Sequence, residues 1–283
     1  MDIFLFLSGI GLYISMSKNK IGKFYKNRFV RIIPKYLIVL IIYSLFVENF
    51  NLFNVIQYLI GLPFFIDGLR DGWYITFIMG LYLIFPLIYK IFKKYDIYAL
   101  FVSLLIIIMF NLMFSIFLPD YYFRWEVGLT RIPVFLVGTF FGKKVSEGSR
   151  ISLKMIKFSF IIHLIILIIL YLNIDLKYFA IYARYLYCPL AVCTVINISW
   201  LYSLIKNKNS LLLKPIKFIG NCSLEMYLFY EKICYVLFFV FSVRNYVNLY
   251  LLAFIISLIM SYLINKIFSL SLNNVFNKKL CKM

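Results

Sequence analysis

The sequence predicts an all-α integral membrane protein, a helical bundle that crosses the bilayer several times. Apolar residues make up 64% of the 283 residues, and the mean hydropathy is +0.93. Charged residues make up only 14%, against about 25% in soluble domains, so most of the surface must face lipid. Apolar runs of about 18 or more residues recur, the length that crosses the hydrocarbon core as a helix. The alternating pattern of β-barrel strands is missing from the sequence, so helices remain the way to satisfy the backbone in lipid.

Hydrophobic runs predict nine membrane-spanning helices in a single membrane domain over residues 1–270, followed by a short basic tail over 271–283. Residues 51–66 alternate Asn and Gln with bulky apolar residues, which favours a helix lying along the membrane surface. The nine spans are expected at residues 2–16, 33–48, 73–92, 97–118, 131–142, 155–173, 179–204, 218–243 and 246–268.

The net charge of +19 comes mainly from loops that the nine spans place on one side of the membrane. Acidic residues predominate in the opposite loops. This bias assigns the basic loops and the C-terminus to the cytoplasm and the N-terminus to the outer side of the plasma membrane. Anionic lipid headgroups account for the charge, so nucleic acid is not expected as a partner. The basic stretches are 18–35, 90–94, 143–157, 206–217 and 266–282.

The five cysteines show neither paired spacing nor a CxxC motif. We therefore expect no disulfide framework, no metal site and no bound cofactor. Three of them lie in apolar segments, one lies near the start of such a segment and one lies in the tail. They are Cys188, Cys193, Cys234, Cys222 and Cys281, in that order.

The first basic stretch is denser than membrane orientation requires, with seven Lys or Arg residues between positions 18 and 35. Arg28 and Arg31 are three residues apart, so on a helix they share a face and can bind one polyanion. The phosphates of a nucleotide-bearing donor such as coenzyme A suit this pair. The alternative is a loop that orients the protein against anionic lipid.

Polar residues in the span at 218–243 also gather on one face. Charged groups this deep rarely face lipid, so Glu225, Glu231 and Lys232 imply a polar cavity or an internal ion pair. The side chains at helical spacing are Ser223, Tyr227, Tyr230 and Glu231.

Other features have packing or anchoring explanations. Small residues over 6–12 favour close helix packing, Trp73 at a span entrance is typical of an interfacial anchor, and Arg131 at a span edge is typical of a snorkelling side chain. His163, the only histidine, lies among apolar residues with no visible partner to orient it as a general base, so packing or hydrogen bonding is favoured.

Five short segments along nearly the whole chain carry a family resemblance. They are Phe6-Leu7-Ser8-Gly9, Arg28-Phe29-Val30-Arg31-Ile32-Ile33-Pro34-Lys35-Tyr36, Trp73 with Tyr82 and Pro86, Arg131-Ile132-Pro133 with Phe135 and Gly138, and Ser223-Leu224-Glu225-Met226-Tyr227-Leu228. In this order they resemble the acyltransferase 3 family of membrane acyltransferases, and the Arg-rich segment is the most specific of them.

The resemblance implies a fold of ten membrane helices with both ends in the cytoplasm. It also implies acylation of hydroxyls on envelope sugars or lipids, often O-acetylation from acetyl-coenzyme A. Arg28, Arg31, Lys26 and Lys35 would then bind the donor. The residues that would line the site are Ser8, Trp73, Arg131, Ser223, Tyr227 and Tyr230.

Two departures from the family pattern concern the catalytic base. Members begin with a helix that carries an Arg and, eleven residues on, the catalytic His, and this helix precedes the Phe-Leu-Ser-Gly segment. Here Met1 stands just before that segment, so the sequence is expected to lack the helix. A His commonly closes the last motif, where this chain has Tyr230. Glu231 or His163 would have to replace the base.

The sequence therefore favours an acyltransferase that moves an acyl group, expected to be acetyl, from a coenzyme A thioester to a cell-envelope glycan or a lipid-linked sugar. Three alternatives stay open: a chain that is inactive as written because the His helix is missing, a non-catalytic polysaccharide export or assembly protein on the same fold, and a glycan polymerase, which would not explain the Arg-rich segment. An in-frame segment upstream of Met1 with an Arg and, eleven residues on, a His would argue against the inactive chain. Loss of glycan O-acetyl groups with glycan export intact in a deletion strain would argue against the export protein.

Overall fold

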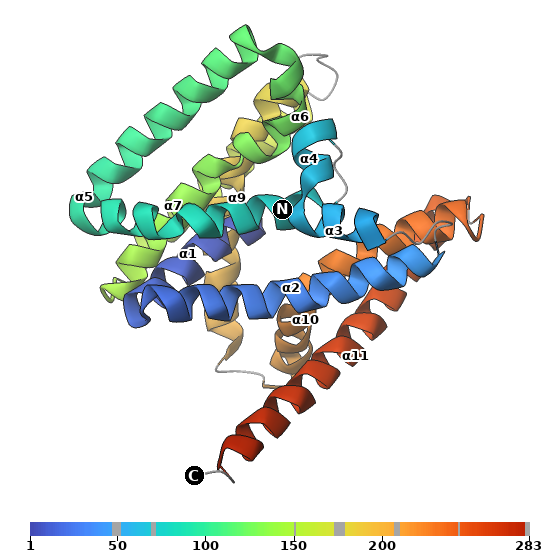
Figure 1. Cartoon of the computed structure of the whole chain (residues 1–283). Helices are drawn as coiled ribbons and strands as arrows, with labels where there is room; N and C mark the ends of the chain where they lie inside the picture. Colours follow the sequence, from blue (N-terminus) through green and yellow to red (C-terminus); the bar gives the residue numbers. More distant parts are fainter. Residues whose placement is uncertain are drawn as a thin grey trace. The chain divides into compact units, whose positions relative to one another are not determined.

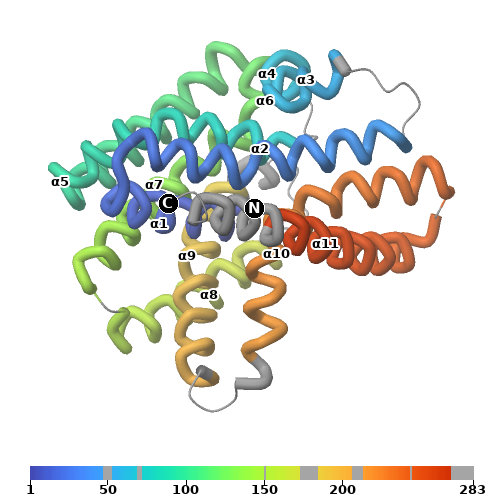
Figure 2. The backbone as a smooth tube through the Cα atoms, turned by 60° about the horizontal axis from the view of Figure 1, so that its bottom comes forward, coloured from blue at the N-terminus to red at the C-terminus, as the bar shows by residue number. Residues whose placement is uncertain are grey.

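The computed structural model describes residues 1–46, 52–68, 72–149, 151–172, 179–206, 210–242 and 244–280, and these residues are helical almost throughout, with no strand among them. This confirms the predicted all-α fold. The helices are α1 (Asp2–Lys18), α2 (Ile21–Phe46), α3 (Leu52–Ile60), α4 (Leu62–Asp67), α5 (Trp73–Phe117), α6 (Pro119–Leu129), α7 (Ile132–Ser146), α8 (Leu153–Leu172), α9 (Phe179–Lys206), α10 (Ser210–Phe239) and α11 (Tyr246–Leu280). Figure 1 labels all of them except α8, which Figure 2 labels.

Each predicted span overlaps a helix over most of its length, and the span ends at 47–48, 173 and 243 lie outside the described residues. Within the described ranges, five helical segments are long and apolar enough to cross a membrane, in α2, α5, α8, α9 and α11, and α10, which contains most of the span predicted at 218–243, is not among them. The spans predicted at 2–16 and 131–142 are the shorter helices α1 and α7. The surface segment predicted at 51–66 is helical as α3 and α4, separated at Gly61 by a positive φ of 80°. Helix α6 was not predicted, because its mixed polar and aromatic residues show no long apolar run.

Helix α5 contains two of the predicted spans, 73–92 and 97–118. Its helical geometry breaks at Asp96, where φ is 50° and ψ is −120°, and the chain turns there into a second arm (Figure 1). Lys143 and Lys144 of α7 lie 3.3 and 2.8 Å from the Asp96 carboxylate. The Lys144 ammonium, which donates a hydrogen bond to Asp96, lowers the pKa of that carboxyl. The ion pairs thus hold the bend between the two arms.

The described chain forms two compact units. Unit 1 comprises Met1–Arg28 and Pro63–Lys208, and unit 2 comprises Phe29–Leu62 and Asn209–Met283. In unit 1, α1 packs against α7, α5 packs against α6 and α7, and α8 packs against α9. In unit 2, α10 and α11 pack along each other (Figure 2). The predicted domain limit at residue 270 falls inside α11 and stays a prediction, since side chains beyond Phe268 and the last residues, Cys281 among them, lie outside the described part.

Helices α1 and α7 approach each other through glycine. A Cβ atom placed on Gly9 would lie 2.5 Å from the Phe135 carbonyl oxygen, and one on Gly138 would lie 2.2 Å from the Phe6 carbonyl oxygen. Both contacts are with backbone, which cannot move aside cheaply. The close packing predicted from the small residues over 6–12 is therefore confirmed, and it joins two of the family-like segments.

Candidate functional site

Lys35 is held in a buried polar network of unit 2. Its ammonium forms an ion pair with the Glu225 carboxylate and donates a hydrogen bond to Asn265 Oδ1 at 2.9 Å. Glu225 is only 2% exposed, so its charge is removed from lipid by pairing with Lys35. Of the two arrangements that the sequence left open for Glu225, the structure shows the internal ion pair. The predicted role of Lys35 in donor binding stays a prediction.

The same network leaves one acceptor unused. Asn265 Nδ2 donates to the Asn221 carbonyl and to Cys222 Sγ, both at 3.4 Å. The second carboxylate oxygen of Glu225, Oε2, is buried and has no hydrogen-bond partner among the described residues. Buried polar atoms nearly always have a partner, so an oxygen without one at this depth is unusual.

Lys232 has a different environment on the same helix. The side chain is 6% exposed, and its ammonium lies 4.3 Å from the ring centroid of Tyr43 and 5.4 Å from that of Tyr58. Tyr36 donates to the Tyr58 carbonyl at 3.4 Å and so ties α3 to α2. Stacking over aromatic rings stabilises a buried ammonium.

The remaining predicted residues of α10 make local contacts. Ser223 Oγ donates to the Gly220 carbonyl at 2.9 Å, and Tyr227 donates to Glu231 at 3.5 Å, one turn along the helix. Glu231 is exposed, and Ser223, Tyr227 and Tyr230 are half-buried. The structure therefore brings Tyr227 and Glu231 together, while their role in a site stays a prediction.

Arg131 and Trp73 lie together in unit 1. Gly72, with φ 68°, starts α5 at Trp73, and the Arg131 guanidinium lies 5.0 Å from the centre of the Trp73 ring. Arg131 Nε is 3.3 Å from the Asp2 carboxylate, and the guanidinium also donates to the Val127 carbonyl. Arg131 is thus bound within the protein, in contrast to a snorkelling side chain.

Ser8 also has a partner from the predicted set of motifs. Its hydroxyl lies 3.4 Å from the hydroxyl of Tyr82 on α5. The Phe-Leu-Ser-Gly segment therefore contacts α5 through Ser8 and α7 through Gly9. Three of the family-like segments meet in this part of unit 1.

The basic residues of α2 differ in their exposure and in whether they contact other helices. Arg28 is half-buried, and its Nη2 donates to the Gly11 carbonyl at 3.3 Å. Nearby, Phe24 is fully buried and stacks on Phe85 with 5.8 Å between ring centroids. Lys26 and Arg31 are exposed. Arg28 is therefore anchored to α1, and the Arg31 and Lys26 side chains are accessible to an anion.

One buried ion pair was missed by sequence reasoning. Arg184 of α9 pairs with Glu126 of α6, and Glu126 is only 2% exposed. The signal was present, because Arg184 lies inside the span predicted at 179–204, where a charge requires a partner. Nothing in the sequence pointed to Glu126 as that partner, since α6 itself was not predicted.

His163 lies half-buried in α8. Its Nδ1 is buried without a hydrogen-bond partner within the described part of the chain. No contact there orients the ring as a general base, and its role stays a prediction.

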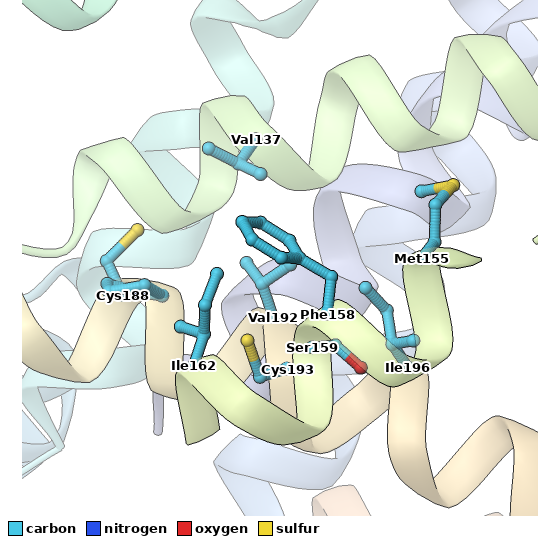
Figure 3. A pocket seen from close by; sticks show the side chains of 10 residues that line it. Val137, Met155, Phe158, Ser159, Ile162, Cys188, Val192, Cys193 and Ile196 are labelled. Carbon is cyan, nitrogen blue, oxygen red and sulfur yellow. The ribbon is translucent and has the colours of Figure 1, made fainter. Parts of the chain in front are cut away.

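A cavity of about 330 Å³ lies between α7, α8 and α9 of unit 1. Figure 3 shows Phe158 pointing towards Val137 across it, with the Cys188 and Cys193 thiols on the α9 side. The Ser159 hydroxyl donates to Asn197 at 2.6 Å and is therefore already bonded. Among the described residues, none of the side chains that line this cavity is charged, so it offers no group that would bind the phosphates of a donor.

The family-like motifs lie on α1, α2, α5, α7 and α10. A comparison with known protein families matches residues 1–266, which include all of these motifs, to the acyltransferase domain of the acyltransferase 3 family. The chain belongs to the acyltransferase 3 family. No curated protein and no solved structure gives a significant match to it. As a member of this family with long apolar helices, the acyltransferase 3 chain is a membrane acyltransferase in the general sense.

Proposed function

We propose that this acyltransferase transfers an acyl group from a coenzyme A thioester to a hydroxyl of a cell-envelope glycan or a lipid-linked sugar. The exposed Arg31 guanidinium of α2 carries the proposal, since Lys35, one turn further on, is already neutralised by Glu225. Arg31, with Lys26 and Arg28, would bind the phosphates of the donor.

The transfer itself makes one bond and breaks one. The acceptor oxygen attacks the thioester carbonyl, the new C–O bond forms, the C–S bond breaks, and the hydroxyl proton passes through a base to the leaving thiolate. A base must lie within hydrogen-bond reach of that hydroxyl. Glu231, which accepts a hydrogen bond from Tyr227, and His163 remain the two candidates.

The proposed orientation follows from the loop charges. The basic stretches would lie in the cytoplasm of a plasma-membrane protein, where the coenzyme A donor is available, with the N-terminus outside and the C-terminus inside. Labelling of single engineered cysteines in intact cells tests this. Reaction of Ser149→Cys, in a chain whose five natural cysteines are replaced, without permeabilisation would contradict the assignment of the 143–157 loop to the cytoplasm.

Arg31→Ala is expected to weaken binding of acetyl-coenzyme A about tenfold or more. Each charge-assisted hydrogen bond contributes about 1.5–3 kcal/mol, and 1.4 kcal/mol corresponds to a factor of ten. Equilibrium dialysis of labelled donor against the chain in nanodiscs measures this. Arg31→Lys keeps the positive charge but loses the planar guanidinium that can bind a phosphate through two hydrogen bonds. The loss of donor affinity in this variant should therefore be smaller than in Arg31→Ala.

Lys23→Ala is the matched control, because Lys23 is an exposed basic residue of the same helix outside the proposed donor set. It should leave donor affinity nearly unchanged. An equal loss in Lys23→Ala and Arg31→Ala would show a general electrostatic effect of the loop and would overturn the assignment.

The acceptor and the class of function are tested in cells. Deletion of the gene should remove acyl groups from the glycan while glycan export continues. Loss of the surface glycan itself would instead support the export or assembly alternative. The export alternative draws on charged groups of α10 as the lining of a polar path. Glu225 instead forms an ion pair with Lys35, and Lys232 lies over aromatic rings.

A further inference from the structure

A second cavity, of about 250 Å³, lies within unit 2 and is formed by α2, α10 and α11. Its wall is apolar apart from Tyr43 and Lys232. Lys232 adds its methylene stem to the wall, since its ammonium lies over the rings of Tyr43 and Tyr58. The apolar side chains that line it include Val39, Ile42, Phe229, Val236, Leu237 and Ile256.

The cavity begins one helical turn beyond the Lys35–Glu225 ion pair. Val39 follows Lys35 by four residues on α2, and Phe229 follows Glu225 by four residues on α10. At 1.5 Å per residue, the eight residues from Arg31 to Val39 span about 12 Å of α2. An exposed guanidinium, a buried ion pair and an apolar cavity thus follow one another along one helix.

The unused oxygen of Glu225 is an independent sign of a ligand at the middle of this series. Glu225 is 2% exposed, and its Oε2 has no partner in the described residues. The arm that joins the phosphates of coenzyme A to the thioester sulfur carries amide N–H groups. A carboxylate oxygen between a phosphate-binding arginine and an apolar cavity is placed to accept from such an amide.

We propose that the cavity between α2, α10 and α11 binds the hydrocarbon chain of the donor's acyl group, so that the preferred donor carries a chain longer than acetyl. This rests on the proposed function. A methylene group is similar in size to a water molecule, which occupies about 30 Å³ of liquid, so a cavity of about 250 Å³ admits several methylene groups. A medium-chain acyl group matches that capacity.

The test is competition of acyl-coenzyme A esters of increasing length against labelled octanoyl-coenzyme A, with the chain in nanodiscs. Burial of a methylene group favours binding roughly fourfold. Affinity should therefore rise steeply from acetyl to octanoyl and level off at hexadecanoyl. Equal affinities along the series would overturn the inference and leave the proposed function standing, whereas failure of every ester to bind would overturn both.

Val236→Phe narrows the cavity. The preferred acyl-coenzyme A should then shift from longer chains towards acetyl, while the affinity for acetyl-coenzyme A stays unchanged. Leu237→Ala enlarges it and should move the preference to longer chains, which gives a second readout if the bulky variant does not fold. Val192→Phe, which fills the unit 1 cavity instead, is the matched control and should leave the preference unchanged.

A bilayer lipid is the competing occupant. A photoreactive phospholipid that labels Val236 or Ile256 peptides, and that octanoyl-coenzyme A does not displace, would overturn the inference. Displacement by octanoyl-coenzyme A, but not by acetyl-coenzyme A at the same concentration, is the expected result.

Discussion

Glu225→Ala is expected to destabilise unit 2 by about 3–5 kcal/mol, because it leaves the Lys35 ammonium, whose side chain is only 12% exposed, without its carboxylate. The temperature at which each buried cysteine becomes reactive during thermal unfolding measures the stability of the unit that contains it. Cys222 adjoins the network in unit 2, and Cys193 is buried in unit 1. Mass spectrometry should show Cys222 becoming reactive at a lower temperature in the variant, with a much smaller change at Cys193.

Two comparisons separate the broken ion pair from a general loss of charge. Glu231→Ala removes an exposed carboxylate of the same helix and should change stability by no more than about 0.5 kcal/mol. Lys35→Met combined with Glu225→Met removes both charges and should recover most of the stability, since apolar replacement of a buried pair is often neutral or favourable. A double variant as unstable as Glu225→Ala would show that the ion pair is not the cause.

Gly138→Ala is expected to destabilise unit 1 by about 3 kcal/mol, at the upper end of the usual range for overpacking. The added methyl group would lie 2.2 Å from the Phe6 carbonyl oxygen, and the contact is between backbones of α1 and α7. The helices must separate to accept it. In this variant Cys193 of unit 1 should become reactive at a lower temperature than in the natural chain, while the temperature at which Cys222 of unit 2 becomes reactive should change much less.

Gly11→Ala is the matched control on α1, two residues from Gly9. A Cβ at Gly11 meets nothing within 4 Å, so no helix has to move. Alanine is better by about 1 kcal/mol in a helix, and the variant should be at least as stable as the natural chain. A loss in Gly11→Ala equal to that in Gly138→Ala would mean that close packing is not what these glycines provide.

The ion pair at Lys35 also changes how the basic stretch is understood. From the sequence, Lys26, Arg28, Arg31 and Lys35 form one set of donor-binding candidates. In the structure Lys35 is paired with Glu225 and Arg28 donates to the Gly11 carbonyl. The exposed members are Lys26 and Arg31. Sequence spacing identifies which residue types gather on a helix, but not which of them another helix has already engaged.

The sequence by itself determined the class of fold, the membrane location of the helices and the family. Long apolar runs must be helical in lipid, because no other arrangement short of a closed barrel satisfies the backbone there. The short helices at 2–16 and 131–142 were predictable from the same apolar character, and helical structure at 51–66 was predictable from its alternation of Asn and Gln with bulky apolar residues. The motifs needed only their order along the chain.

Only the tertiary structure decided the partners of the buried charges. Lys35 and Glu225 are 190 residues apart, and Arg184 pairs with Glu126 of a helix that has no apolar run to reveal it. The sequence could require that each charge find a partner, because an isolated charge in lipid is too costly. Which partner it finds depends on how the helices cross, and that geometry is set by close contacts such as those of Gly9 and Gly138.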